Sequence, residues 1–174
     1  MSSALSDAKA VCLRYIEVMT NGSIEDFEAI VHPDAVNRQA KSEPLACRGR
    51  GPAAYYATAL WVRDAFADLH WEIHDVIAEG DLVALHCTMS GRHTGTVCDY
   101  REDGRVSVAF PPTGRRFAAT QTQWYRITEG KIIEYWANRD DLGMSRQMGW
   151  LPPAPLYLLR MVLARVRARR GAAR

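Results

Sequence analysis

The residue best suited to acid–base chemistry in this sequence is Asp140, at the end of its last predicted strand. This strand covers residues 131–140, and side chains alternate along a strand, so Trp136, Asn138 and Asp140 share one face. With Trp136 in the core, Asp140 lies at the rim of an apolar cavity. Desolvation there raises the pKa of a carboxylate and makes it a stronger base toward a carbon acid. The sequence therefore predicts Asp140 as a general base.

A second aspartate stands beside the first. A helix is predicted to begin near Leu142, and its free backbone amides favour a carboxylate cap from Asp140 or Asp141. The sequence supplies one aspartate for each role. We assign Asp141 to the cap and Asp140 to the pocket.

Two glutamines interrupt the apolar face of the neighbouring strand. Phe117, Ala119, Gln121, Gln123 and Tyr125 alternate along residues 117–125 and share this face. Burying an amide without partners costs roughly a few kcal/mol. The glutamines therefore indicate a wet, ligand-binding interior, unless they simply bond each other or the backbone.

Other reactive groups give weaker signals. His93 continues the face of Met89 and Gly91, so it points into the cavity or is an ordinary hydrogen-bonded histidine. The sequence contains no HxH, HExxH or clustered carboxylates that would predict a metal site. It also contains no GxSxG, GxGxxG or Walker sequence, so a nucleophilic serine or a nucleotide site is not predicted.

The elements that must position these residues change period along the chain. Helical spacing predicts helices over residues 4–20, from Ser23, and over 52–67, with a short strand at 35–39. Alternation then predicts long strands, interrupted by a loop of about twenty residues after Gly91. This order predicts an α+β fold in which a cone-shaped antiparallel sheet carries three N-terminal helices on its concave face, as in a cystatin-like α+β barrel. The open mouth of such a cone is a natural small-molecule site.

Composition favours one cytoplasmic domain. The chain has 174 residues, of which 48% are hydrophobic and 24% charged, enough for one substantial core. Its first residues lack the pattern of a secretion signal. The cysteines are scattered and form no CxxC pair, which indicates reduced, buried thiols rather than disulfides or zinc ligands: Cys12, Cys47, Cys87 and Cys98.

The C-terminal segment differs in charge from the rest. Residues 151–174 contain six arginines and no acid, which leaves 16 basic and 20 acidic residues in 1–150. An acidic body argues against nucleic-acid binding. Residues 155–170 predict a basic amphipathic helix, which either lies on an anionic membrane or a partner, or packs on its own domain or a twin subunit.

Several short motifs, in order, resemble one family. The chain over roughly residues 8–150 is similar to the SnoaL-like polyketide (ester) cyclases, within the superfamily of nuclear transport factor two. The motifs that carry the resemblance are His32-Pro-Asp-Ala-Val-Asn, Gly51-Pro, Ala65-Phe-Ala-Asp-Leu, Val76-Ile-Ala-Glu-Gly-Asp-Leu-Val-Ala, Gly91-Arg-His-Thr-Gly, Pro112-Thr-Gly-Arg-Arg, Tyr125-Arg, Gly130-Lys-Ile-Ile-Glu-Tyr-Trp, Asp140-Asp-Leu-Gly and Gln147-Met-Gly.

This resemblance implies a mechanism. Family cyclases close a ring of a polyketide ester by intramolecular aldol condensation, without metal or cofactor, and commonly dimerise through the outer face of the sheet. An aspartate in the last strand removes the acidic proton, and Asp140 is the similar position here. Gln123 stands where relatives often have a histidine or an acid, and Asn37-Arg38 stands where they often read Asn-His. Arg38, if it points inward, would bind a carboxylate or an enolate.

Other functions remain open at this point, because one fold hosts many activities. An epoxide hydrolase or isomerase would use Asp140, Asn138 and Arg38 to position water, and a non-catalytic ligand-binding or assembly module is the third reading. For the cyclase, we expect contacts to a compact, apolar, oxygenated substrate from Gln121, Gln123, Asn37, Arg38, Asn138, Trp136, Tyr125, His93, Phe117, Tyr56 and Trp61.

Overall fold

The computed structural model describes residues 2–152 and 154–171, so part of the predicted 151–174 extension, namely residues 153 and 172–174, lies outside the described residues. The helices are α1 (Ser2–Asn21), α2 (Ile24–Ile30), the short 3-10 turns η1 (Ala40–Ser42) and η2 (Leu45–Arg48), α3 (Gly51–Ala65), α4 (Asp141–Gln147) and α5 (Pro155–Gly171). The strands are β1 (Val31–Asn37), β2 (Phe66–Glu79), β3 (Leu82–His93), β4 (Val97–Tyr100), β5 (Val106–Phe110), β6 (Arg116–Thr128) and β7 (Lys131–Arg139).

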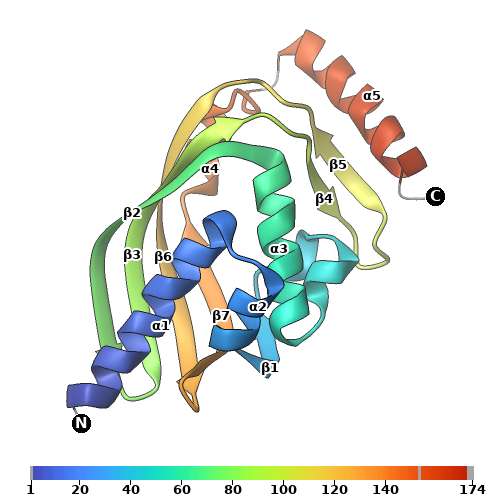
Figure 1. Ribbon diagram of the computed structural model, residues 1–174. Coiled ribbons are helices and arrows are strands. Elements are labelled where there is room, and N and C mark those ends of the chain that lie inside the picture. The colour runs from blue at the N-terminus through green and yellow to red at the C-terminus, as the bar shows by residue number, and fades with distance from the viewer. Residues whose placement is uncertain (1, 153, 172–174) are drawn as a thin grey trace.

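Five strands form one curved sheet in the order β1-β7-β6-β3-β2. The last four pair antiparallel, whereas β1 runs parallel to β7, so the sheet is mixed at one edge. The irregular pairing of β2 between Ala67 and His70 and between Ile73 and Asp75 bends the strand. Figure 1 shows the resulting curve, with α1 and α3 lying on its concave side. The predicted α+β class is therefore confirmed, and the parallel edge strand is the one change to its predicted sheet.

The core lies between the helices and this concave face. Alternate residues of β3 and β6 point into it, so Leu85 and Tyr125 are fully buried. The ring of Tyr15 on α1 meets the rings of Tyr55, Tyr125 and Phe27 edge-on at centroid distances of 5.6–6.2 Å. This aromatic cluster fixes α1 against the sheet and closes one end of the interior.

Local signals account for most helix ends. Ser23 caps α2, and its side chain and that of Asp26 each accept from the other residue's backbone amide. Pro52 stands in the first turn of α3, where its missing N–H costs nothing. These helix positions agree with those expected from the sequence.

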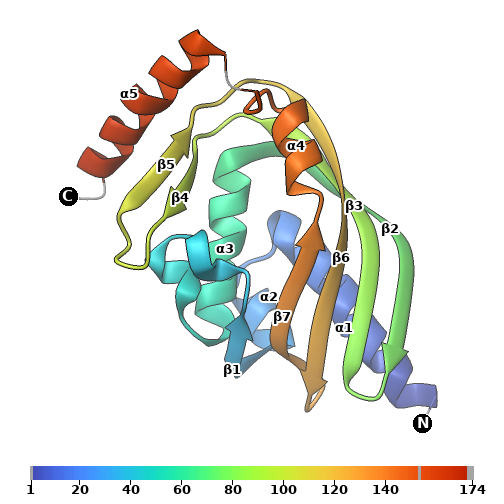
Figure 2. The ribbon, with the colours of Figure 1, turned by 180° about the vertical axis from the view of Figure 1, so that it is seen from behind.

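The region expected to be a long loop contains a second, two-stranded sheet. β4 and β5 pair antiparallel between residues 97 and 110 and extend beyond the mouth of the curved sheet. Figure 2 shows α4 at the end of β7 and α5 against the outside of β5. The hairpin thus forms an additional wall at the open end of the cone.

Over residues 2–152 and 154–171, no helix is both long enough and apolar enough to cross a membrane.

Candidate functional site

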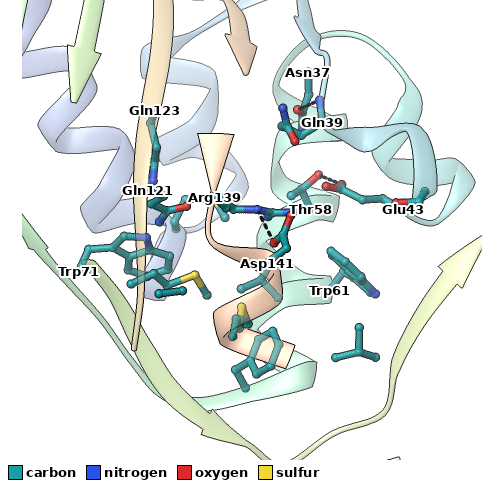
Figure 3. A pocket seen from close by; sticks show the side chains of 18 of the residues that line it. Asn37, Gln39, Glu43, Thr58, Trp61, Trp71, Gln121, Gln123, Arg139 and Asp141 are labelled. Carbon is teal, nitrogen blue, oxygen red and sulfur yellow. Dashed lines mark hydrogen bonds and ion pairs between the residues drawn. The ribbon is translucent and has the colours of Figure 1, made fainter. Parts of the chain in front are cut away.

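A cavity of about 370 Å³ opens between the curved sheet, α1, α3, α4 and the β4–β5 hairpin. Its size suits a small organic ligand. Most of its wall is apolar, formed by Tyr15, Ile16, Met19, Trp61, Val62, Phe66, Trp71, Met89, Val97, Phe110, Ala119, Met144 and Trp150. Polar side chains enter it from the end of β1 and the loop that follows, from α3, from the neighbouring strands β6 and β7, and from the start of α4 (Figure 3). One more polar side chain comes from β4.

Glu43 is the most sheltered carboxylate of this wall. It follows η1, its backbone N–H donates to the carbonyl of Ala40, and its side chain is 6% exposed. The hydroxyl of Thr58 on α3 donates to Oε2 of Glu43 at 2.8 Å. Burial raises the pKa of Glu43, while the Thr58 hydrogen bond and the charge of Arg139 act in the opposite direction. The Cys47 thiol also hydrogen-bonds to this carboxylate. A desolvated carboxylate with so few donors is suited to take up and return a proton.

Arg139 brings positive charge to the end of β7. Its Nε lies 3.2 Å from Oδ1 of Asp141, and both side chains line the cavity (Figure 3). Asp99 on β4 also lines it, and burial followed by the charge of Asp141 raises the pKa of Asp99, whereas Arg139 lowers it. One guanidinium therefore shares the cavity with three carboxyl groups.

Four buried donors in this wall have no acceptor among the described residues: Asn37 Nδ2, Gln121 Nε2, Trp71 Nε1 and Trp150 Nε1. Asn37 Oδ1 is already occupied, because it accepts from the backbone N–H of Gln39 at 2.9 Å. A buried donor left unpaired costs about 1–3 kcal/mol. Acceptor oxygens of a ligand would recover this cost, so the wall is suited to a molecule rich in carbonyl oxygens.

The family follows from comparison with known proteins. A family model described as SnoaL-like polyketide cyclase matches residues 9–148. The chain belongs to this family. It is 31% identical over 143 residues to the aklanonic acid methyl ester cyclase DnrD of Streptomyces peucetius, covering 82% of this chain and 90% of that protein. It is 30% identical to the aklanonic acid methyl ester cyclase DauD of Streptomyces sp. strain C5, covering 82% and 81%.

Solved structures agree on the fold. TsrD from Streptomyces laurentii superimposes with a TM-score of 0.68 at 23% identity, over 84% of this chain and 97% of that one. A SnoaL-like polyketide cyclase from Agrobacterium tumefaciens gives 0.61 at 15% identity, over 82% and 98%. The family model and the two relatives confirm the resemblance inferred from sequence motifs and the cyclase-type function at the level of the family, and the solved structures confirm the fold.

The structure places the two aspartates opposite to our assignment. Asp140 caps α4, since its Oδ1 accepts from the N–H of Gly143 at 2.8 Å, and Asp141 lines the cavity. Gly143 permits this close approach, because a Cβ there would lie 2.0 Å from Oδ2 of Asp140. The prediction that Asp141 caps the helix and Asp140 faces the pocket is therefore wrong.

The cause is the choice of which β7 side chains face the cavity. In the pairing with β6, Tyr135, Ala137 and Arg139 stand opposite the inward residues Tyr125, Gln123 and Gln121. The predicted inward set is consequently on the outer face. There Trp136 stacks on Trp124 with ring centroids 6.1 Å apart, and Asn138 is exposed opposite Thr122. A shift of one residue moves every side chain of a strand to the other face.

Arg38 also points outward. It forms an ion pair with Glu134, and its guanidinium lies 5.3 Å from the ring centroid of Trp136. An inward role for Arg38 in binding an enolate is therefore wrong, and Arg139 is the arginine that lies in the wall.

Four predicted contact residues do lie in the cavity wall: Gln121, Gln123, Asn37 and Trp61. The two glutamines are 4% and 3% exposed, and Gln123 accepts from the hydroxyl of Tyr125 while its amide donates to Cys87 Sγ at 3.7 Å. Gln123 therefore finds protein partners, as one of the two interpretations of the sequence allowed, whereas Gln121 Nε2 has no acceptor among the described residues.

Four others are buried or half-buried outside this wall. Tyr125 and Phe117 belong to the core, and Tyr56 packs on Phe27. His93 is fully buried, with Nδ1 accepting from the N–H of Thr113 at 3.3 Å, and burial lowers its pKa to about 4. The ordinary hydrogen-bonded reading of His93 is thus the one that its contacts favour.

Sequence reasoning missed the charged groups of the site. Glu43 stands between two 3-10 turns and has no periodic neighbours, so no local pattern distinguishes it from an exposed loop residue. Asp99 was hidden because β4 was expected to be loop. The alternation of side chains along β7 could have identified Arg139 and Asp141, but the prediction assigned the wrong alternate residues to the inner face.

Proposed function

We propose that this protein closes a ring in a polyketide ester by acid–base chemistry carried by its own side chains, with Glu43 as the base. The single observation that carries the proposal is a carboxylate, 6% exposed, in the wall of a cavity that also holds unpaired N–H donors. The names of DnrD and DauD, both aklanonic acid methyl ester cyclases, suggest the substrate class, a methyl ester of a polyketide acid.

The reaction would proceed in two balanced steps. The Glu43 carboxylate removes a proton from the carbon next to the ester carbonyl, and the resulting enolate carbon attacks a ketone carbon of the same molecule. The new alkoxide then takes the proton back from Glu43, so the product is an isomer of the substrate. Holding both ends of the substrate in one cavity lowers the entropic part of the barrier.

Charge develops on oxygen in both steps, and the cavity provides donors for it. Arg139 and the amide N–H groups of Gln121 and Asn37 would stabilise the enolate and alkoxide oxygens. Asn37 and Gln121 are buried, where such donors act strongly, whereas the side chain of Arg139 is 41% exposed and is partly screened by solvent. The apolar wall, with Trp61 and Trp71, would hold the ring system.

Glu43→Gln tests the base. Glutamine keeps the shape and can still accept from Thr58, so binding of aklanonic acid methyl ester should persist while turnover falls about 10²–10⁴-fold. In the unchanged protein the rate should rise with pH through the raised pKa of Glu43, and the residual rate of Glu43→Gln should lack this dependence.

Asp99→Asn and Asp141→Asn are the matched controls. Each replaces a carboxyl group of the same wall by an amide, and each should retain most of the turnover. Full activity in Glu43→Gln together with loss in Asp99→Asn would refute the assignment of the base. Tight binding without turnover in every form, including the unchanged protein, would instead favour a ligand-binding module.

A second candidate, epoxide hydrolysis, is favoured by one observation. Epoxide hydrolysis needs two acidic side chains, and Asp99 and Asp141 share the cavity with Arg139 and Asn37. Asp141 would take a proton from water, the hydroxide would attack an epoxide carbon, and Asp99, whose pKa is raised by burial, would give its proton to the leaving oxygen. Incorporation of oxygen from isotopically labelled water into a diol would support this function, and cyclisation involves no such incorporation.

We further propose a homodimer through the outer face of the curved sheet. Support comes from the stacked pair Trp124 and Trp136 and from Ile77, which is 67% exposed on the same sheet. Trp136→Glu should then shift the mass measured by light scattering from two chains to one. A single-chain mass for the unchanged protein would exclude the dimer.

A cytoplasmic location is also proposed. It is supported by the four cysteines, all of which are buried free thiols, as expected in a reducing compartment. Fractionation of cells that express the protein checks this location.

A further inference from the structure

The C-terminal helix α5 has an inner face bound to its own domain. The hydroxyl of Tyr157 donates to the carbonyl of Pro111 at 3.0 Å, and two N–H groups of Arg169 donate to the carbonyl of Val106 at 2.9 and 3.1 Å. Between them, Ala164 and Ala168 pack against the small apolar cluster of the β4–β5 hairpin. These contacts fix the rotation of α5 about its axis.

The opposite face therefore points away from the protein, and it is apolar. Its side chains, which we call the outer stripe, are 42–72% exposed: Leu156, Leu158, Leu159, Val162, Leu163 and Val166. Figures 1 and 2 show α5 on the outside of β5, beyond the curved sheet. Single exposed leucines are normal on a surface, but a continuous stripe of aliphatic side chains marks an interaction site.

The charge around the stripe is of one sign. From Leu151 onward the sequence has six arginines and no acid, whereas residues 1–150 have 16 basic and 20 acidic residues. Arg167 and Arg170 are exposed on the last turns of α5, next to Val166. The occupant of this face must accept aliphatic side chains and also carry negative charge.

We propose that α5 docks on the surface of an anionic lipid bilayer. In this arrangement the outer stripe enters the boundary between head groups and acyl chains, and Arg167 and Arg170 lie among the anionic head groups. A fluid bilayer accepts six aliphatic side chains without a matching surface, and its negative charge complements the arginines. The helix lies on the membrane, because its inner face stays bound to the hairpin.

Cosedimentation with vesicles tests this proposal on the full-length protein. The protein should pellet with vesicles of equimolar phosphatidylglycerol and phosphatidylcholine but not with phosphatidylcholine alone, and added salt should weaken binding. Replacing Arg167 and Arg170 by glutamine should weaken binding about fivefold for each arginine. The double variant Leu159→Glu/Leu163→Glu should abolish it.

The matched control is Leu13→Glu/Leu60→Glu, which places the same two charges on exposed leucines of α1 and α3 and should leave binding unchanged. Equal pelleting with both kinds of vesicle, or undiminished binding by the double variant, would overturn the proposal. So would an absence of vesicle binding by the unchanged protein. In that case, a mass by light scattering that halves in the double variant would identify a second copy of this chain as the occupant of the stripe.

Discussion

Replacing Asp140 with alanine tests the distinction between a helix cap and a catalytic base. The Asp140 carboxylate accepts from the N–H of Gly143 at 2.8 Å, and its own carbonyl accepts from Met144 at 3.0 Å. The substitution removes the first bond and keeps the second. Loss of an N-cap side chain costs about 1 kcal/mol. For a chain of this length, that free energy lowers Tm by about 2–4 °C.

Asp140→Ala should have only a small effect on catalytic activity. α4 carries Met144 and Ser145 into the cavity wall, so a frayed first turn loosens one side of the pocket. The other end of α4 stays held, because the Gln147 side chain both accepts from and donates to the backbone of Ala118, at 2.8 and 2.9 Å. We therefore expect a modest rise in KM and a nearly unchanged kcat.

Asp140→Ser separates the two roles. Serine is a good N-cap but has no carboxylate, so this variant should keep both the Tm and the turnover of the unchanged protein. Thermal unfolding gives the stability, and conversion of aklanonic acid methyl ester followed by chromatography gives the rate. If Asp140→Ser unfolds normally but loses turnover by a factor of about 10² or more, the expected contribution of a catalytic base, then Asp140 acts in the chemistry and the reasoning from β7 is wrong.

Three further outcomes follow from buried groups. Burial raises the pKa of Glu43 above 4.5, so the stability linked to its proton is fully present below pH 4.5 and is lost as the pH rises through the folded pKa. The urea midpoint of Glu43→Gln should not show this loss. The same pH dependence in Glu43→Gln as in the unchanged protein would contradict the prediction. Burial lowers the pKa of His93 from 6.5 to about 4, so the stability linked to its neutral ring is present above pH 6.5 and is lost as the pH falls through about 4. In His93→Asn, the urea midpoint should decrease less over this pH range. Tyr157→Phe removes the hydrogen bond to Pro111 and should cost about 0.5–1.5 kcal/mol, with faster amide exchange in β5 by mass spectrometry, and no change in exchange would show that the bond does not hold α5 on the hairpin.

The sequence by itself determined the elements whose patterns are local. Ser23 with the acids after it predicted the start of α2, and the long helical stripe predicted α1. The alternation of Phe117, Ala119, Gln121 and Gln123 predicted the inward face of β6, and all four side chains are buried. These patterns depend on residues a few positions apart, so they can be interpreted without knowing which segments pack against them.

The pairing of β7 with β6 decided which side chains of β7 face the cavity. Aromatic residues occupy both of its faces, Tyr135 inside and Trp136 outside, so alternation fits either choice. The register with β6 selects one, and with it Asp140 becomes a cap and Arg139 enters the cavity. β7 follows β6 after only Glu129 and Gly130, so the pairing itself is local. A register shift of this hairpin between Arg126 and Ile127 moves the pairing by one residue, and alternation along either strand does not show that shift.

Glu43 shows the same limit for a loop residue. Its neighbours in sequence form two short turns, whereas the groups that act on its carboxylate come from distant segments: Thr58 on α3 donates to it, and the charge of Arg139 on β7 lowers its pKa. Whether a carboxyl group is a solvated surface charge or a desolvated base depends on which distant groups exclude water from it. The sequence determined that this chain folds around a cavity, and the packing of distant segments decided which carboxylates line it.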